Sequence, residues 1–383
     1  MTKANQPTTS NSNQMTAGRS VSRRGFMQLA VAGAAGIASL NGARALAAAE
    51  TQNPGGKPPA QPGDFEVGAQ RLSISKLREW EDLKYGMFIH FGMGTYVQGK
   101  IHLDIPDGNT PISTYNPDKL DVDSWVQIGR DAGMKYAVLT AKHVCGHALW
   151  PSRFSDYTVA QSPNTTDVVA AFVKACETHG LRAGLYYDSY DNHNRFGQVN
   201  VSPANEYPWQ EKGLKTTYTT SLYQDFQTAQ VTELLGRYGP IHEVWIDIPQ
   251  LLGRGYRAYL YEAIAKMQPD AVIMMNSGKL ETAWPTDLRT YERGLPPESG
   301  HVGWNEIEGK RYYVPGEYCN PIAKNWFYVE GDNPRPDEEL LRLLTETRKR
   351  GVNLLLDVPP DKHGLIPKDS QAALMRLRKN ANL

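Results

Sequence analysis

Short apolar runs recur along the chain between Tyr85 and Val358. Six of them are continuously apolar and do not alternate between apolar and polar positions, which is typical of strands buried on both faces of a parallel sheet. These runs are Tyr85–Phe91, Lys135–Ala141, Arg182–Tyr187, Glu243–Ile248, Ala271–Asn276 and Val352–Val358. We therefore predict a strand at each of them.

Helical segments separate the apolar runs. Five segments begin after a capping residue or a proline, or end at a glycine or before a proline, which are the usual start and stop signals of helices. They are Asp121–Ala132, Thr166–His179, Thr220–Tyr238, Gly255–Met267 and Asp337–Arg350. Residues 277–335 are irregular, and we place two further strands there, near Leu288–Glu292 and Asn325–Val329.

The alternation of strands and helices predicts βαβ units and a parallel sheet. With at least six such strands, the chain after residue 75 fits a (β/α)8 TIM-type barrel better than a doubly wound sheet. No glycine-rich phosphate loop follows the first strand, which also argues against a dinucleotide-binding fold. In such a barrel, functional groups lie at the C-terminal ends of the strands.

The first residues of the chain have a different character. Residues 1–47 carry five basic residues and no acidic one, and Ser22–Met27 is followed by an apolar stretch at Leu29–Leu40 and by Ala45–Ala47. This order of charged, apolar and small residues predicts a cleaved export signal, and the adjacent arginines resemble a twin-arginine signal. An uncleaved membrane anchor is the alternative, although a span needs about 20 apolar residues.

A linker is predicted after this signal. Seven of the ten residues in Pro54–Gly63 are proline or glycine, so this stretch cannot bury enough apolar surface to order itself. We therefore divide the chain into a twin-arginine signal peptide at 1–47, a linker at 48–74 and a catalytic barrel at 75–383. The mature protein is expected in the periplasm or outside the cell, without stable membrane insertion.

Charge and composition narrow the class of function. The whole chain is neutral, with 41 Lys and Arg against 41 Asp and Glu, but the part after Ala47 has 36 basic against 41 acidic residues, a net charge of −5. This leaves no basic field for nucleic acid. Three cysteines exclude a scaffold built on disulfides. The 8 Trp and 20 Tyr suit a sugar, whose C–H faces stack on aromatic rings.

Polar residues end the predicted strands. In chain order they are His90, His143, Asp188, Asp247, Asn276 and Glu292. Such groups at the ends of apolar strands must be paired or must face a shared cavity. A pair of carboxylates flanked by aromatic residues is typical of glycoside hydrolysis, where one carboxylate attacks or activates water and the other protonates the leaving oxygen.

Five segments, in the same order, resemble the α-L-fucosidases of glycoside hydrolase family 29. They are Lys84–Gly92, the stretch from Tyr115 to Ser152, Gly184–Tyr187, Leu234–Asp247 and Gly351–Pro367. The resemblance extends from Leu77 to Pro367. It implies a retaining exo-α-L-fucosidase that uses no metal or cofactor and removes terminal α-linked L-fucose, with α-1,3/1,4 linkages among its substrates, from oligosaccharides or glycoconjugates.

The resemblance also implies roles for individual residues. Asp247 matches the nucleophile, and Glu292 matches the acid/base residue, with Glu298 as the runner-up. His90 and His143 match histidines that bind the sugar hydroxyls. The remaining matches are aromatic residues of the pocket: Trp150, Tyr187, Trp245 and Trp326.

The sequence departs from the family pattern at three places. Val144–His147 stands where the family has a second histidine followed by Asp-Gly-Phe, so one contact with a sugar hydroxyl is lost or is supplied by His147. Ile248-Pro249 replaces a glycine after the nucleophile, which alters the backbone beside the carboxylate. Only 16 residues follow Pro367, so we expect no C-terminal β-sandwich module.

Other interpretations of these residues stay open. Asp247 could cap a loop, Glu292 could pair with a neighbouring arginine, and the histidines could be core residues. The spacing of His143, Cys145 and His147 could indicate a metal site, although zinc would need further ligands of definite geometry. At the level of function, the alternatives are a hydrolase for another α-linked sugar and a non-catalytic sugar-binding barrel.

Overall fold

The computed structural model of the chain describes residues 66–97, 108–194 and 219–383. All of these residues belong to one compact unit, which runs from Ala60 to Leu383. The predicted export signal, and the predicted linker up to residue 65, lie outside the described residues.

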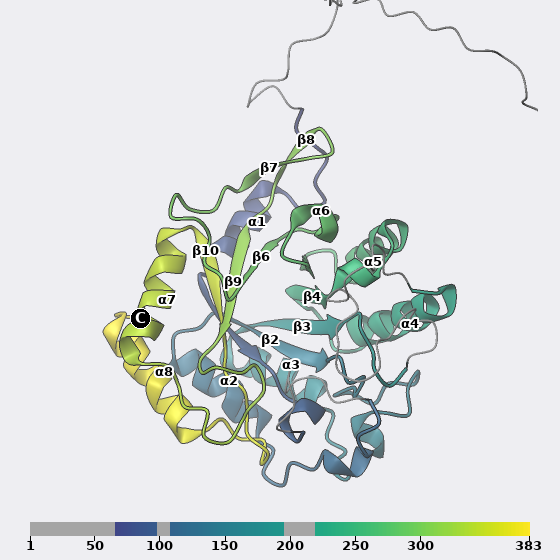
Figure 1. Cartoon of the computed structure of the whole chain (residues 1–383), viewed down its shortest axis with the longest axis vertical. Coiled ribbons are helices and arrows are strands. Elements are labelled where there is room, and N and C mark those ends of the chain that lie inside the picture. Colours follow the sequence, from purple (N-terminus) through teal and green to yellow (C-terminus); the bar gives the residue numbers. More distant parts are fainter. Residues whose placement is uncertain (1–65, 98–107, 195–218) are drawn as a thin grey trace, which may run out of the picture. The chain divides into compact units, whose positions relative to one another are not determined.

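Eight parallel strands pair in the order β5-β4-β3-β2-β1-β10-β9-β6. Six of them, β2, β3, β4, β6, β9 and β10, are labelled in Figure 1. Their bounds are β1 Tyr85–Ile89, β2 Tyr136–Lys142, β3 Arg182–Asp188, β4 Glu243–Asp247, β5 Val272–Asn276, β6 Arg289–Glu292, β9 Gly316–Pro321 and β10 Val352–Asp357. Two further strands, β7 Trp304–Ile307 and β8 Lys310–Tyr313, form a separate antiparallel hairpin between β6 and β9. The predicted (β/α)8 TIM-type fold is confirmed, as a nearly closed barrel of eight parallel strands.

The two edge strands, β5 and β6, are joined through the residues that precede β6. The backbone N–H of Asp287 donates to the carbonyl of Ile273 at 2.8 Å. In return, the N–H of Ile273 donates to the Asp287 carboxylate at 2.9 Å, and the N–H of Met275 donates to the Thr286 hydroxyl at 3.1 Å. Two side chains therefore supply acceptors that a neighbouring strand would normally supply, and we call this junction the Asp287 seam.

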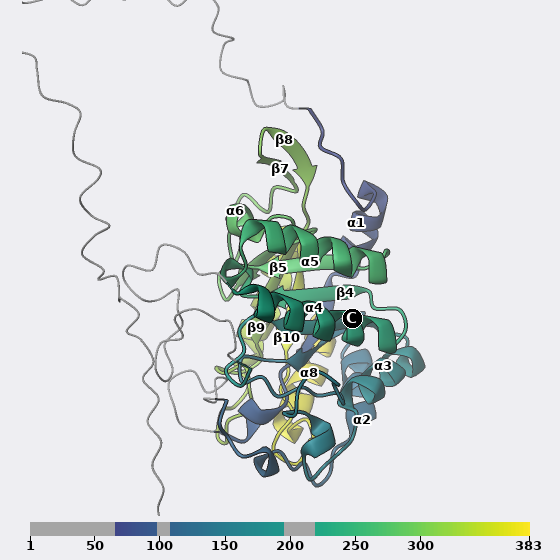
Figure 2. The same cartoon turned by 90° about the vertical axis from the view of Figure 1, so that its right-hand side faces the viewer.

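Helices cover the outside of the strands. Their bounds are α1 Ile74–Glu81, α2 Val122–Asp131, α3 Val168–His179, α4 Ser221–Arg237, α5 Arg254–Met267, α6 Leu280–Ala283, α7 Asp337–Lys349 and α8 Lys368–Asn380. The five predicted helices agree with α2, α3, α4, α5 and α7 to within two residues at either end. Figure 2 looks onto α4 and α5, which lie over the strands β4 and β5.

Local signals account for both ends of α3. The carboxylate of Asp167 accepts a hydrogen bond from the backbone of Ala170 at 2.9 Å and so caps the start of α3. The same helix ends at Gly180, whose φ of 73° is left-handed and favours glycine. Within the described ranges, no helix combines the length and the apolar character that a membrane span requires.

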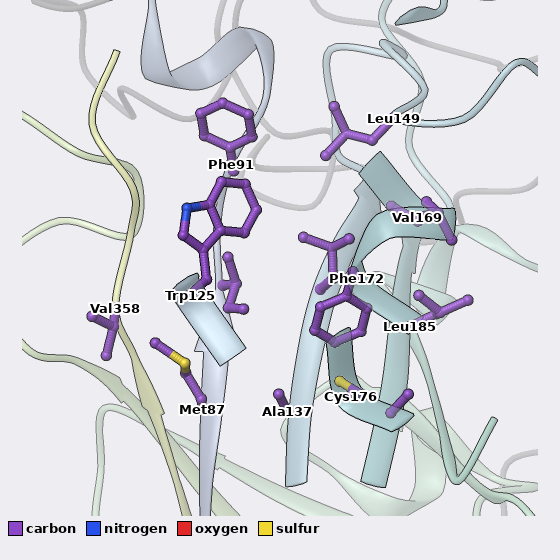
Figure 3. Packing of buried hydrophobic residues seen from close by; sticks show 14 of the residues in the cluster. Met87, Phe91, Trp125, Ala137, Leu149, Val169, Phe172, Cys176, Leu185 and Val358 are labelled. Atoms are coloured by element: carbon purple, nitrogen blue, oxygen red, sulfur yellow. The ribbon is translucent and has the colours of Figure 1, made fainter. Parts of the chain in front are cut away.

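Successive residues of each barrel strand point alternately outward and inward. The outward side chains join the helices in the main core, where the rings of Phe91 and Trp125 meet edge to face at 5.0 Å (Figure 3). Inward side chains such as Phe88, Tyr186 and Trp245 form a second buried cluster inside the barrel. Because both sides are apolar, the strands appear in the sequence as continuous apolar runs.

The seventh barrel strand is not where we predicted it. It is β9, Gly316–Pro321, whereas Asn325–Val329 is a loop held by hydrogen bonds to Asp332. All six residues of β9 are buried, although Glu317 and Asn320 are polar. A polar strand with internal partners carries no apolar run, and this is why the sequence pattern missed it.

The last residues of the predicted linker contact the barrel. Val67 forms an isolated bridge with Arg311 of β8, and Leu72 is buried. The Arg71 guanidinium donates to the carbonyls of Pro269 and Ala271 and pairs with the Asp287 carboxylate. This segment therefore ties the chain before α1 to the Asp287 seam.

Candidate active site

Interior side chains at the C-terminal ends of the strands form a cluster of polar groups. It contains two histidines, four carboxyl groups and one amide: His90, His143, Asp188, Asp247, Asn276, Glu292 and Asp357. Parallel strands place these ends at one edge of the barrel, and so the structure brings together residues that are far apart in the sequence.

Asp247 and Glu292 are linked through one amide group. The Asn276 Nδ2 donates to Asp247 Oδ1 at 2.8 Å and to Glu292 Oε2 at 3.3 Å. Because one nitrogen contacts both oxygens, these oxygens lie within about 6 Å of each other. Glu292 is exposed and Asp247 is half-buried, so both carboxylates can meet a molecule arriving from solvent.

Asp247 accepts three hydrogen bonds. Besides Asn276, the Tyr186 hydroxyl donates to Oδ2 at 2.7 Å, and the backbone N–H of Ile248 donates to Oδ1 at 3.0 Å. Burial, followed by the nearby Glu292 charge, raises the Asp247 pKa to about 6, while these hydrogen bonds act in the opposite direction. Asp247 is therefore mainly ionised at neutral pH.

His90 and His143 lie side by side, with ring centres 5.5 Å apart. The His90 Nδ1 is 2.9 Å from the buried carboxylate of Asp357, which fixes the orientation of the His90 ring. The His143 ring stacks on Tyr186 at 5.4 Å with an interplanar angle of 8°. Both imidazoles are therefore part of the cluster that contains Asp247.

A bulge in β2 turns His143 toward the interior. Thr140 pairs with the inward-facing Tyr186, but Lys142 pairs with the outward-facing Tyr187, so Ala141 and Lys142 together oppose a single residue of β3. The Lys142 ammonium lies 4.4 Å from the centre of the Tyr187 ring and forms a fully buried ion pair with Asp191 at 2.9 Å. We call this feature the β2 bulge.

Aromatic side chains line the same edge. The Trp326 ring is 5.1 Å from His90, and the neighbouring Phe327 is 5.3 Å from His90 and 5.2 Å from His143. Arg293, which follows Glu292, lies over the Trp326 ring at 4.8 Å. Trp326 is therefore placed between the histidine pair and the end of β6.

Trp245 lies one layer below Asp247 and stacks on Tyr186 at 5.7 Å. Its indole N–H donates to Glu317 Oε1 at 2.9 Å, and the Tyr136 hydroxyl donates to the other oxygen at 2.7 Å. Burial raises the pKa of Glu317 to about 7, and burial together with Glu317 raises the pKa of Glu243 well above its ordinary value. This pair of interior carboxyl groups, the Glu243–Glu317 pair, forms the polar floor beneath Trp245.

Three of the predicted site residues lie elsewhere. Tyr187 faces outward and donates to Gln230 of α4 at 2.8 Å. Trp150 is fully buried in the outer core and donates to Glu233 of the same helix at 3.2 Å. The His147 ring packs on Tyr115 and Tyr157, with Nε2 3.1 Å from the Ser162 hydroxyl.

Glu298 lies at the opposite end of the barrel from Asp247. Its loop is held by Arg350, which donates to the Pro296 carbonyl and accepts from the His301 N–H at 2.8 Å. Arg350 lies two residues before the start of β10, so this loop belongs to the N-terminal ends of the strands. Of the two glutamates that the sequence offered, only Glu292 is beside Asp247.

The departures from the family pattern contact one another. Val144, Tyr190, Ile248 and Leu251 form a separate buried cluster beside Asp247. Ile248 has φ 54° and ψ 45°, the left-handed region that glycine adopts most readily. For a β-branched residue this conformation costs roughly 1–2 kcal/mol, and it aims the Ile248 N–H at the Asp247 carboxylate.

Three residues of the site received no role from the sequence. Tyr186 replaces Tyr187 as the tyrosine that faces the carboxylates, while Asn276 bridges them and Asp357 orients His90. The alternation of inward and outward positions, counted back from Asp247 and Asp188, would have identified Tyr186. The rule that selected the other strand-end residues would have identified Asp357 at the end of Val352–Val358, although not its partner His90, which lies 267 residues earlier.

The structure gives no support to a metal site at His143, Cys145 and His147. The two imidazoles face different sides of the β2 strand end, as their ring contacts show. Over the described part of the chain, no three His, Cys, Asp or Glu side chains are arranged to hold a metal ion. Cys145, Cys176 and Cys319 are all buried and unbridged.

The arrangement is suited to acid–base and nucleophilic chemistry on a polar molecule. An ionised Asp247 can attack or activate water, and the exposed Glu292 within reach of the same amide can transfer a proton. The imidazoles can hydrogen-bond hydroxyl groups, and Trp326 and Phe327 offer apolar faces to C–H groups.

Comparison with known proteins assigns this combination to one family. A sequence profile of the α-L-fucosidase family matches residues 109–379, which is more than half of the chain. α-L-Fucosidase 1 of Arabidopsis thaliana is 30% identical over 338 residues, which cover 81% of this chain and 60% of that protein. The chain thus spans about 60% of the length of this relative.

Solved structures agree with this assignment. α-L-Fucosidase isoenzyme 1 from Paenibacillus thiaminolyticus superposes with a TM-score of 0.68 at 26% identity, covering 80% of this chain and 75% of that one. A glycoside hydrolase 29 family member from an unknown rumen bacterium gives a TM-score of 0.66 at 26% identity, covering 82% of this chain and 57% of that one.

Proposed function

Since the chain belongs to the α-L-fucosidase family, we propose that it is an exported, retaining exo-α-L-fucosidase. Its substrates are fucosylated oligosaccharides or glycoconjugates with a terminal α-linked L-fucose. The observation that carries this proposal is the Asn276 amide, which holds Asp247 and Glu292 within about 6 Å of each other. Retaining glycosidases place their two carboxyl groups about 5–5.5 Å apart, and inverting enzymes about 6.5–9.5 Å.

In the proposed mechanism, Asp247 is the nucleophile. Its carboxylate attacks the anomeric carbon of fucose while Glu292 protonates the glycosidic oxygen, so the C–O bond breaks and a covalent fucosyl–Asp247 ester forms. Glu292, now a carboxylate, deprotonates a water molecule that attacks the same carbon. Fucose then leaves with net retention, and both carboxyl groups return to their starting states.

The neighbouring groups fit the binding of a deoxy sugar. The His90 and His143 imidazoles can contact ring hydroxyls, and Asp357 holds the His90 tautomer with a proton on Nδ1. Trp326 and Phe327 supply apolar surface for the methyl group that distinguishes fucose. Tyr187, Trp150 and His147 have no part in this pocket and act as core residues.

Two finer parts of the proposal rest on the sequence. The family resemblance, with Glu292 matching the acid/base residue, supports α-1,3/1,4 linkages as substrates. The charged, apolar and small-residue segments of residues 1–47 support twin-arginine export to the periplasm or beyond.

Turnover of an aryl α-L-fucoside and of a branched α-1,3/1,4-fucosylated trisaccharide tests the function and the linkage together. We expect both to be cleaved, with the α-anomer of fucose as the first product seen by proton NMR. The variant Asp247→Asn should fold normally but lose at least about 10³-fold in kcat. Hydrolysis of another aryl glycoside in place of the fucoside, or normal rates in this variant, would refute the proposal.

A further inference from the structure

The Tyr186 hydroxyl lies between two carboxyl groups. Its oxygen is 2.7 Å from Asp247 Oδ2 and 3.0 Å from Asp188 Oδ2. A phenol has one proton to donate, and burial raises the pKa of Tyr186 well above its ordinary value, so the hydroxyl keeps that proton. Two hydrogen bonds at these distances need two protons, and the second proton must belong to a carboxyl group.

The surroundings of the two carboxyl groups differ. Asp247 is half-buried at the open end of the barrel and accepts from Tyr186, Asn276 and the Ile248 N–H, three donors that favour the ionised form. Asp188 is completely buried. Apart from Tyr186, it accepts the backbone N–H of Tyr190, at 2.7 Å on Oδ1. The second proton therefore belongs on Asp188 Oδ2.

The charges that face Asp188 point the same way. From β4, Asp247 presents a negative charge, which is itself close to Glu292 on β6. From β2, Lys142 is the nearby cation, but its ammonium is paired with Asp191 at 2.9 Å, and both side chains are fully buried. His143, also from β2, stacks on Tyr186. Burial and the Asp247 charge together raise the pKa of Asp188 well above its ordinary value.

We propose that Asp188 is a neutral carboxylic acid that donates its proton to the Tyr186 hydroxyl oxygen, so that the Tyr186 proton is committed to Asp247. Asp188 is then a positioning residue, because it acts on Asp247 through Tyr186. The proposal rests on the proposed function only in taking Asp247 as the nucleophile. Hydrogen bonds in such a chain polarise one another, and the chain helps to keep a carboxylate ionised where burial opposes ionisation.

Two substitutions at Asp188 separate this role from that of an ionised carboxylate. In Asp188→Asn, the amide oxygen can accept from Tyr190 and the amide N–H can donate to Tyr186 without adding charge. We expect kcat/KM within about threefold of the wild type and an unmoved acidic limb of its pH profile. Leucine in Asp188→Leu has no donor for Tyr186. We expect kcat/KM to be about tenfold lower and the acidic limb of its pH profile to lie about half a pH unit higher.

An ionised Asp188 would give a different pattern. Both substitutions would remove the same negative charge near Asp247 and would shift the acidic limb to lower pH together. That result would overturn the proposal.

Asp188→Leu also removes the hydrogen bond that Asp188 accepts from the Tyr190 N–H. A second set of variants, built on Tyr186→Phe, separates this effect from the proposed one. Tyr186→Phe removes the central hydroxyl and leaves the hydrogen bond between Asp188 and Tyr190 intact. If Asp188 acts through Tyr186, then adding Asp188→Leu to Tyr186→Phe should leave the acidic limb where Tyr186→Phe put it. An equal further shift in the double variant would show that Asp188 acts by another route, against the proposal.

The protonation state can also be read without turnover. In protein labelled with ¹³C at the aspartate carboxyl carbons, the resonance that disappears in Asp188→Asn should show a protonated carboxyl from about pH 5 to pH 8. An ionised resonance in that range would refute the inference whatever the substrate proves to be. Failure of the wild type to cleave fucosides would refute the proposed function alone and leave this measurement valid.

Discussion

At the scale of single residues, Asn276 connects the two proposed catalytic carboxylates. Its amide donates to both, and this hydrogen bond lowers the pKa of Asp247, which burial and the Glu292 charge raise to about 6. A nucleophile must be ionised, so we expect wild-type kcat/KM to fall as the pH drops through about 6.

The Asn276 amide links the two carboxylates and favours the ionised form of Asp247, and Asn276→Ala should remove both effects. We expect kcat/KM to fall by about 10- to 100-fold, and the acidic limb of the pH profile to move to higher pH, because Asp247 loses a donor that favours its ionised form. The profile should be measured with an aryl fucoside. Asn320→Ala is a matched control, since Asn320 is equally buried but donates to Tyr318 on the outer side of β9. A limb that moves equally in both variants would count against the bridging role.

The sequence predicted the members of the site better than their orientation. His90, His143, Asp247, Trp245, Glu292 and Trp326 do come together at the strand ends. Tyr187 and Trp150 do not. Counting back from Asp188 places Tyr187 on the outward face of β3, and Trp150 lies beyond the end of β2, where the alternation of a strand does not apply. His147 is displaced for another reason, since it follows the loop after the β2 bulge and turns into the outer core.

At the scale of the elements, the Asp287 seam joins the edges of the barrel. The Asp287 carboxyl accepts from Ile273, from the Tyr261 hydroxyl at 2.5 Å and from Arg71. Its partners come from β5, from α5 and from the segment before α1, so a single buried side chain links three parts of the chain.

Truncation at the seam should be costly. We expect Asp287→Ala to lower the free energy of unfolding by about 3–5 kcal/mol, because it leaves a half-buried guanidinium and a buried N–H without their acceptor. Urea denaturation measures the change. Asp270→Ala is the control, since this nearby aspartate is exposed and its ion pair with Lys76 is 3.9 Å long. In this control the free energy of unfolding should change by less than about 0.5 kcal/mol. Similar losses in the two variants would contradict the importance of the seam.

The sequence predicted seven of the eight barrel strands and five of the helices. The missed strand, β9, carries Glu317 and Asn320, and so it lacks the apolar run on which the prediction depended. The partners that make these polar residues acceptable, Tyr136 and Trp245 for Glu317, come from other strands. Local sequence cannot show such long-range compensation, and this is why polar barrel strands escape pattern-based prediction.

At the scale of the whole molecule, the Glu243–Glu317 pair places two carboxyl groups inside the barrel. Burial raises the pKa of Glu317 from 4.5 to about 7, so the native state binds protons that the unfolded chain releases. The resulting stability is fully present below about pH 4.5 and is lost as the pH rises through about 7.

Glu317→Gln should remove this dependence on pH. We expect the melting temperature of the wild type, relative to this variant, to decrease between about pH 5 and pH 8. Differential scanning calorimetry of the two proteins across that range measures the difference. Glu306 is exposed on β7, so the difference in melting temperature between the wild type and Glu306→Gln should stay constant across this pH range. A constant difference for Glu317→Gln as well would mean that Glu317 has the same charge in the folded and unfolded states.

The β2 bulge has a consequence for how this barrel can change. Because Lys142 pairs with Tyr187, the partner that Ala141 would have in a regular strand, loss of Ala141 would remove the bulge and leave the Lys142 ammonium facing outward and the His143 imidazole facing inward. The strand end would therefore keep its inward and outward side chains with one residue fewer, whereas regular pairing with Ala141 retained would exchange them. Libraries of substitutions would never sample this shorter strand, whereas a single codon deletion would make it in one step.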